Sequence, residues 1–170
     1  MANSMTDKCL DNNKQYASGQ AMHKPVYPGK QPIQPSKRVA VVACMDARLD
    51  VEETLGLRTG DAHIIRNAGG LATDDVIRSL IISQTLLGTD EIVVIGHTRC
   101  GLQGADEAAI HAQLAGSSGV DLDMGFGSFD DVEMSVRASV ERLRAHPWIR
   151  STHVHGLVFD VATGRLLELT

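Results

Sequence analysis

Three short runs of mostly apolar residues, spaced along the first hundred positions, constrain the fold of this 170-residue chain most strongly. The runs are residues 39–43, 62–65 and 91–95. Continuous apolar character over such short lengths is typical of strands that are buried on both faces, as in parallel sheets. Segments with helical periodicity alternate with these runs. The alternation predicts an α/β fold, a mainly parallel central β-sheet flanked by helices on both faces.

The helical segments have recognisable ends. The expected helices lie at 50–55, from Thr73 or Asp74 to about Leu87, at 105–114 and at 132–145, and two further strands lie at 152–159 and 165–169. Gly88 is a suitable end for the second helix and Pro147 for the last one. Residues 116–128 are rich in Gly, Ser and Asp and are expected to form a loop.

The first 37 residues differ from the rest in composition. Residues 11–16 have weak helical character, and residues 23–37 hold four of the five prolines. A proline-rich segment is extended and has no core of its own. We therefore expect residues 1–37 to form a helix and an arm that packs on a partner subunit, and residues 38–170 to form a single α/β domain.

Composition and charge exclude several classes of protein. The formal net charge of −5 and the lack of a basic block argue against nucleic-acid binding. No apolar run approaches membrane-spanning length, and residues 1–20 lack the apolar core of a signal peptide, so a cytoplasmic location is expected. Three cysteines, an odd number, favour metal binding or catalysis over a disulfide framework.

Two polar clusters follow the first and third apolar runs. Cys44-Met45-Asp46-Ala47-Arg48 comes first, and His97-Thr98-Arg99-Cys100-Gly101 comes second. Ligand sites in parallel sheets lie beyond the carboxyl ends of the strands, so neighbouring strands would bring Cys44, His97 and Cys100 together. Two thiolates and one imidazole suit Zn²⁺ in tetrahedral geometry, and three protein ligands leave the fourth position open for water.

Asp46 and Arg48 are expected beside that open position. Asp46 could accept a hydrogen bond from zinc-bound hydroxide, with Arg48 keeping it ionised, or it could itself become a fourth ligand in a closed state. Taken singly, these residues have ordinary explanations: a buried core cysteine, a hydrogen-bonded histidine or a surface ion pair. The presence of both clusters, each at the end of a strand, is much harder to explain by such ordinary structural roles.

Other candidate sites have weaker support. The Gly69-Gly70 pair lacks the lysine of a phosphate-binding loop and is expected to be a tight turn near the site. A phosphatase-type interpretation of Asp46 leaves His97 and Cys100 unexplained. Cys9 has no partner motif, and the remaining histidines are scattered, although one of them could relay protons.

The pattern C-x-D-x-R followed about fifty residues later by H-x-x-C-G resembles the β-class carbonic anhydrases. The turn Ile65-Arg66-Asn67-Ala68-Gly69 is also similar to theirs, and the resemblance is clear over residues 38–101. It implies that Cys44, His97 and Cys100 hold zinc and that Asp46 and Arg48 form the catalytic dyad. It also implies reversible hydration of carbon dioxide to bicarbonate, and a homodimer or dimer of dimers with the N-terminal segment laid on the partner.

The resemblance leaves the substrate open. Many members have serine at the positions of Met45 and Ala47, and this short chain is similar to the compact bacterial subgroup. That subgroup shares its fold with hydrolases of carbonyl sulfide and carbon disulfide, and the stretch 16–55 resembles the carbonyl sulfide branch. Carbonic anhydrase is the leading interpretation, with these hydrolases as the alternative. A non-catalytic zinc-binding domain is the third hypothesis.

Overall fold

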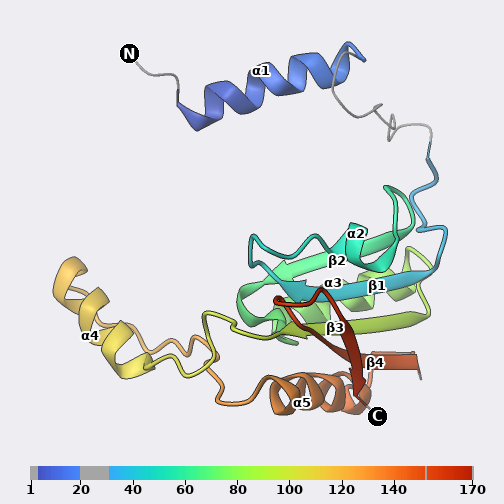
Figure 1. The fold of residues 1–170 in the computed structure, drawn as a ribbon. Coiled ribbons are helices and arrows are strands. Elements are labelled where there is room, and N and C mark those ends of the chain that lie inside the picture. Colours follow the sequence, from blue (N-terminus) through green and yellow to red (C-terminus); the bar gives the residue numbers. More distant parts are fainter. Residues whose placement is uncertain (1–3, 20–30, 152, 170) are drawn as a thin grey trace. The chain divides into compact units, whose positions relative to one another are not determined.

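The computed structural model describes residues 4–19, 31–151 and 153–169, and the chain divides into two compact units between Pro32 and Ile33. The described part of the first unit is helix α1 (Met5–Ala17; Figure 1). This helix begins well before the 11–16 segment that the sequence indicated. The reason is a capping box, in which the Ser4 side chain accepts from the Asp7 backbone N–H and the Asp7 carboxylate accepts from that of Ser4.

The second unit is built on a five-stranded sheet. The strands are β1 (Val39–Cys44), β2 (Ala62–Asn67), β3 (Glu91–His97), β4 (His153–Phe159) and β5 (Leu166–Leu169), in the order β2-β1-β3-β4-β5. All neighbouring pairs are parallel except β4 and β5. The predicted α/β fold with a mainly parallel sheet is therefore confirmed. Strand order reverses between β1 and β3, where parallel sheets bind their ligands.

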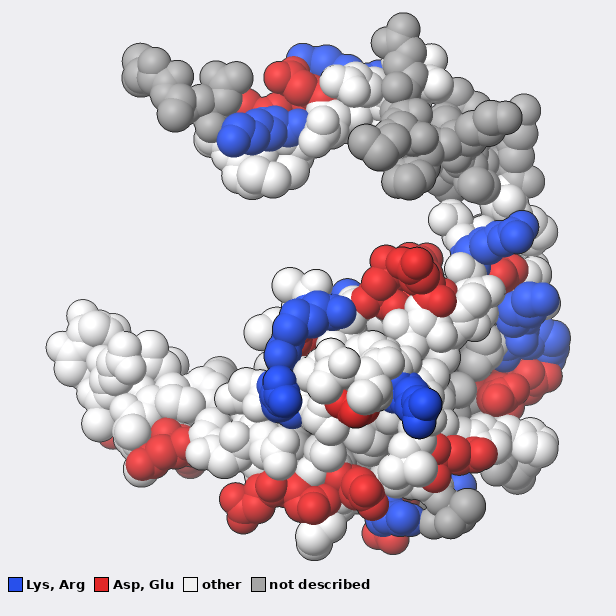
Figure 2. All heavy atoms as spheres, in the orientation of Figure 1, with Lys and Arg blue, Asp and Glu red and all other residues white. Residues whose placement is uncertain are grey.

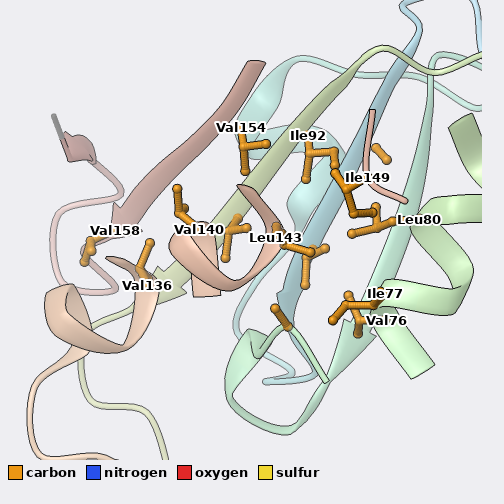
Figure 3. Close-up of a cluster of buried hydrophobic side chains, with 14 residues drawn as sticks. Val76, Ile77, Leu80, Ile92, Val136, Val140, Leu143, Ile149, Val154 and Val158 are labelled. Atoms are coloured by element: carbon orange, nitrogen blue, oxygen red, sulfur yellow. The ribbon is translucent and has the colours of Figure 1, made fainter. Parts of the chain in front are cut away.

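Helices cover both faces of this sheet, as expected. Helices α3 (Asp74–Thr85) and α5 (Val132–Ala145) pack on one face, where their Leu80, Val140 and Leu143 side chains meet Ile92 and Val154 of the strands (Figure 3). On the other face the short α2 (Val51–Leu55) and its neighbouring loops cover a second apolar cluster. The strands are thus apolar on both sides because both sides are packed.

Strands β2 and β3 are longer than their apolar runs. The backbone ladder continues to Asn67, which pairs with Cys44, and to His97, which pairs with Phe159. The polar residues that were expected just beyond the strands therefore begin within them. Helix α3 ends at Thr85, two residues before the predicted end, and Gly88 lies in the turn that follows, with φ +77°.

Helix α4 (Glu107–Ser118) lies farther along the chain than the predicted helix at 105–114. The Asp106 side chain caps its start by accepting from the Ala109 backbone N–H at 3.0 Å. Gly119 ends it in the left-handed conformation, with φ +70°. The predicted loop at 116–128 was therefore wrong for residues 116–118, because Gly116 continues the helix and Gly119 ends it.

The last residues of the predicted arm, 33–37, belong to the second unit. Pro35 is buried, and Ser36 donates its backbone N–H to Gly60 and its hydroxyl to Asp61. Residues 23–30 of the proline-rich segment lie outside the described residues.

The described part of the second unit carries charges of both signs on its surface (Figure 2). On the visible face of the second unit, basic and acidic side chains are interspersed, without a continuous basic patch (Figure 2). None of the helices in the described ranges is both long and apolar enough to span a bilayer.

Candidate metal centre

Strands β1 and β3 bring the two polar clusters together. Cys44 is the last residue of β1, His97 is the last residue of β3, and Cys100 lies in the turn that follows. All three side chains are buried, and their donor atoms lie within 4.8 Å of one another. Because β1 and β3 are direct neighbours, residues from distant parts of the chain share one site at the carboxyl ends of these strands.

The distances between donor atoms fit a tetrahedral metal ion. The Sγ atoms of Cys44 and Cys100 are 4.0 Å apart. Two thiolates bound to zinc at about 2.3 Å in tetrahedral geometry would be about 3.8 Å apart, whereas a disulfide requires about 2.0 Å. Burial and the neighbouring Cys44 raise the pKa of the Cys100 thiol. A divalent cation between the two sulfurs would reverse this effect, since it stabilises the thiolate.

His97 supplies the nitrogen donor. Its Nδ1 lies 2.9 Å from the Thr98 carbonyl oxygen, and because a carbonyl only accepts, Nδ1 carries the proton. The Nε2 atom then carries no proton and has a lone pair available for a metal ion. It is buried and has no hydrogen-bond partner among the described residues. An unsatisfied buried nitrogen beside two thiols is costly unless a metal binds there, so the donor set fits zinc.

Asp46 and Arg48 form a bidentate pair beside this group. The Arg48 guanidinium donates from Nε to Oδ1 at 2.9 Å and from Nη2 to Oδ2 at 2.7 Å, and the Arg48 backbone N–H also donates to Oδ1. These hydrogen bonds hold the pKa of Asp46 well below its usual range. Asp46 Oδ2 lies 3.8 Å from His97 Nε2, so the carboxylate borders the donor group while Arg48 holds it.

Two residues that the sequence linked to the site only through the resemblance support its backbone. Arg66 donates from Nε to the Cys44 carbonyl at 2.9 Å and from Nη2 to the Asp46 carbonyl at 2.6 Å. Asn67 closes the following turn, with both its amide nitrogen and its oxygen bonded to the Leu71 backbone. These contacts depend on the register between β1 and β2. That register is a long-range feature, so local sequence patterns do not indicate it.

Gly70 confirms the predicted tight turn beside the site. Its φ of +66° favours glycine, and a Cβ atom there would lie 2.9 Å from the Cys44 nitrogen and from the Ile95 oxygen. Only a residue without a side chain allows the turn to approach both central strands this closely.

The remaining candidates are not members of the donor group. Cys9 is an exposed free thiol of α1 in the first unit. Four of the other histidines contact residues outside the donor group, in the pairs His63–Ser83, His111–Phe126, His146–Trp148 and His155–Glu168.

Comparison with known proteins agrees with this geometry. The carbonic anhydrase family model matches residues 39–124. Beta-carbonic anhydrase 1 of Mycobacterium tuberculosis is 46% identical over 98% of both chains. A carbon disulfide hydrolase of Acidithiobacillus thiooxidans is 39% identical over 77% of this chain and 76% of its own.

Solved structures give the same result. The carbonic anhydrase of Streptococcus mutans is 44% identical, covers all of both chains and superposes with a TM-score of 0.89. That of Glaciozyma antarctica is 38% identical, covers 99% of this chain and all of its own, and has a TM-score of 0.85. Shared sequence and fold over nearly the whole length confirm the resemblance, and the chain belongs to the β-carbonic anhydrase family.

Proposed function

We propose that this chain catalyses the reversible hydration of carbon dioxide to bicarbonate, with zinc held by Cys44, His97 and Cys100. The observation that carries the proposal is the buried group of two thiols and one unpartnered imidazole nitrogen at the carboxyl ends of β1 and β3. Bound zinc lowers the pKa of water to about 7 and so supplies hydroxide at neutral pH. The full-length similarity to named carbonic anhydrases supports the same reaction.

Asp46 is proposed to orient the attacking oxygen. Ionised by its pairing with Arg48, its carboxylate only accepts hydrogen bonds, and it borders the donor group at 3.8 Å from His97 Nε2. Accepting a hydrogen bond from the attacking oxygen would direct the lone pair of that oxygen to the substrate carbon.

Arg48 is proposed to keep Asp46 away from the metal. Both carboxylate oxygens are engaged by the guanidinium, so binding zinc through Asp46 would cost these charge-assisted hydrogen bonds. The described arrangement therefore supports an open fourth position rather than Asp46 as a ligand.

Substitutions of Asp46 and Arg48 test these two roles. Asp46→Asn should retain zinc but lose roughly 10- to 100-fold in turnover, because an amide is not an equivalent acceptor. Arg48→Ala should retain zinc and also lose turnover, since Asp46 is then free to approach the metal. Zinc content and stopped-flow rates are measured on the same preparations. Parental turnover in Asp46→Asn would exclude the orienting role.

Hydrolysis of carbonyl sulfide or carbon disulfide is the alternative. The 39% identity to a carbon disulfide hydrolase supports it, and all these substrates are linear molecules attacked at a central carbon. Parallel assays with carbon dioxide, carbonyl sulfide and carbon disulfide on one preparation distinguish the reactions. A zinc-containing protein that is inactive on all three would favour the non-catalytic hypothesis.

Self-association is a further part of the proposal. We infer that the N-terminal segment up to Pro32, which includes helix α1, packs on a second copy in a homodimer or dimer of dimers. Helix α1 buries none of its described side chains, and its Met5 and Leu10 are 70% and 57% exposed. Apolar side chains on a helix without a core favour a partner surface. The cytoplasmic location expected from the sequence stays a prediction.

A further inference from the structure

Two successive carbonyl groups in the turn after β3 serve the two halves of the site. The Thr98 oxygen accepts from Nδ1 of His97, and the Arg99 oxygen accepts from Nη2 of Arg48, each at 2.9 Å. Arg99 has φ +56°, a left-handed conformation that is uncommon for a residue with a side chain. This dipeptide therefore supplies one backbone acceptor to the imidazole and one to the guanidinium.

Thr98 is held by the chain that leaves β4. Its backbone N–H donates to the Phe159 carbonyl at 2.9 Å. Its hydroxyl accepts from the Val161 backbone N–H at 3.1 Å and donates to Asp160 Oδ1 at 3.3 Å. The threonine is thus attached by both main chain and side chain to residues more than sixty positions away.

The turn that holds Thr98 is itself well ordered by hydrogen bonds. Asp160 accepts from the Ala162 backbone N–H at 2.9 Å and from the Thr163 hydroxyl at 2.8 Å. The Gly164 N–H closes the turn on the Asp160 carbonyl at 2.8 Å. A carboxylate fixed by several donors is a firm anchor for the hydroxyl of Thr98.

We propose that Thr98 is a positioning residue of the active site, acting through its hydroxyl and the turn at 160–164. By fixing the Thr98 peptide, this contact keeps His97 Nε2 directed at the metal position and keeps Arg48 on Asp46. Groups that orient metal ligands control both metal affinity and rate. The inference rests on the proposed zinc site and adds a role to a residue that touches neither metal nor substrate.

Thr98→Val tests the inference, because it keeps the branched shape and removes only the hydroxyl. The full-length variant should bind zinc about tenfold more weakly in competition with a chelator, with kcat lowered and KM unchanged. Thr98→Ser restores the hydroxyl and should recover most of the zinc affinity.

Thr89→Val is the matched control. It removes a buried threonine hydroxyl, which bonds Ser83 and touches neither the turn at 160–164 nor the donor group, so it should lower the unfolding temperature without changing zinc affinity. Parental zinc affinity in Thr98→Val overturns the inference, and so does an equal loss of affinity in both variants, which would indicate general destabilisation. If the parental chain binds no zinc, the proposed function falls and this inference falls with it.

Discussion

The close approach of Gly70 to the two central strands allows a stringent test of the packing beneath the metal centre. Gly70 lies at the end of the short 3₁₀ turn η2 (Ala68–Gly70), and a methyl group added there would lie 2.9 Å from backbone atoms of both Cys44 and Ile95. Because backbone atoms of a sheet cannot rotate away, Gly70→Ala should force β1 and β3 to shift next to the metal ligands.

The expected loss of unfolding free energy in Gly70→Ala has two parts. A left-handed backbone costs a residue with a side chain about 1–2 kcal/mol. Overpacking against fixed atoms adds about 1–3 kcal/mol, which gives about 2–5 kcal/mol in total for Gly70→Ala. Gly56 has the same φ of +66° but no atom within 4 Å of its added Cβ. Gly56→Ala should therefore cost only the first part, about 1–2 kcal/mol.

Urea denaturation measures both variants at one protomer concentration and one zinc concentration, since bound metal and self-association change the apparent stability. The difference between the two losses of unfolding free energy, Gly70→Ala minus Gly56→Ala, measures the cost of the contact with the strands. Zinc content should fall only in Gly70→Ala, because only that substitution displaces Cys44. Equal losses of unfolding free energy in the two variants would refute the packing argument.

Three further predictions concern the ligands, the arm and the α4 region. Cys100→Ala should lose zinc and activity together by metal analysis and rate assay, whereas Cys9→Ala should lose neither. Deleting residues 1–32 should lower stability and shift the chain toward monomer, and sedimentation matching the full-length protein would contradict this. The Glu107 carboxylate accepts from the backbone of Ser128 and Phe126, which lowers its pKa. Its stabilisation is therefore present at neutral pH and lost as pH falls below about 4. At neutral pH, Glu107→Gln should accelerate hydrogen exchange at those two amides.

Local patterns predicted the parts of the fold that depend on local chemistry. The apolar runs located β1 and β3, and the periodic segment at 132–145 matches α5 in both bounds. The prediction that two strand-end clusters meet depended only on strand adjacency, which the sheet order provides.

Features that depend on distant contacts were not predictable in this way. The hydroxyl of Thr98 meets Asp160 only because β3 and β4 are neighbours, and no spacing in the sequence indicates that contact. Arg66 likewise supports Cys44 through the register of β2. The true end of α4 depended on which of two nearby glycines adopts the left-handed conformation, a choice that composition does not determine.

The adjacency of β1 and β3 also has a consequence for folding. Cys44 and Cys100 are 56 positions apart, so in the unfolded chain they end a long loop whose closure is entropically unfavourable. Pairing of the two strands closes that loop and brings both sulfurs to one site. Until then only the local His97 and Cys100 pair is available, and it should bind zinc weakly. Retention of zinc during refolding would therefore report that the central strands have paired in the correct order.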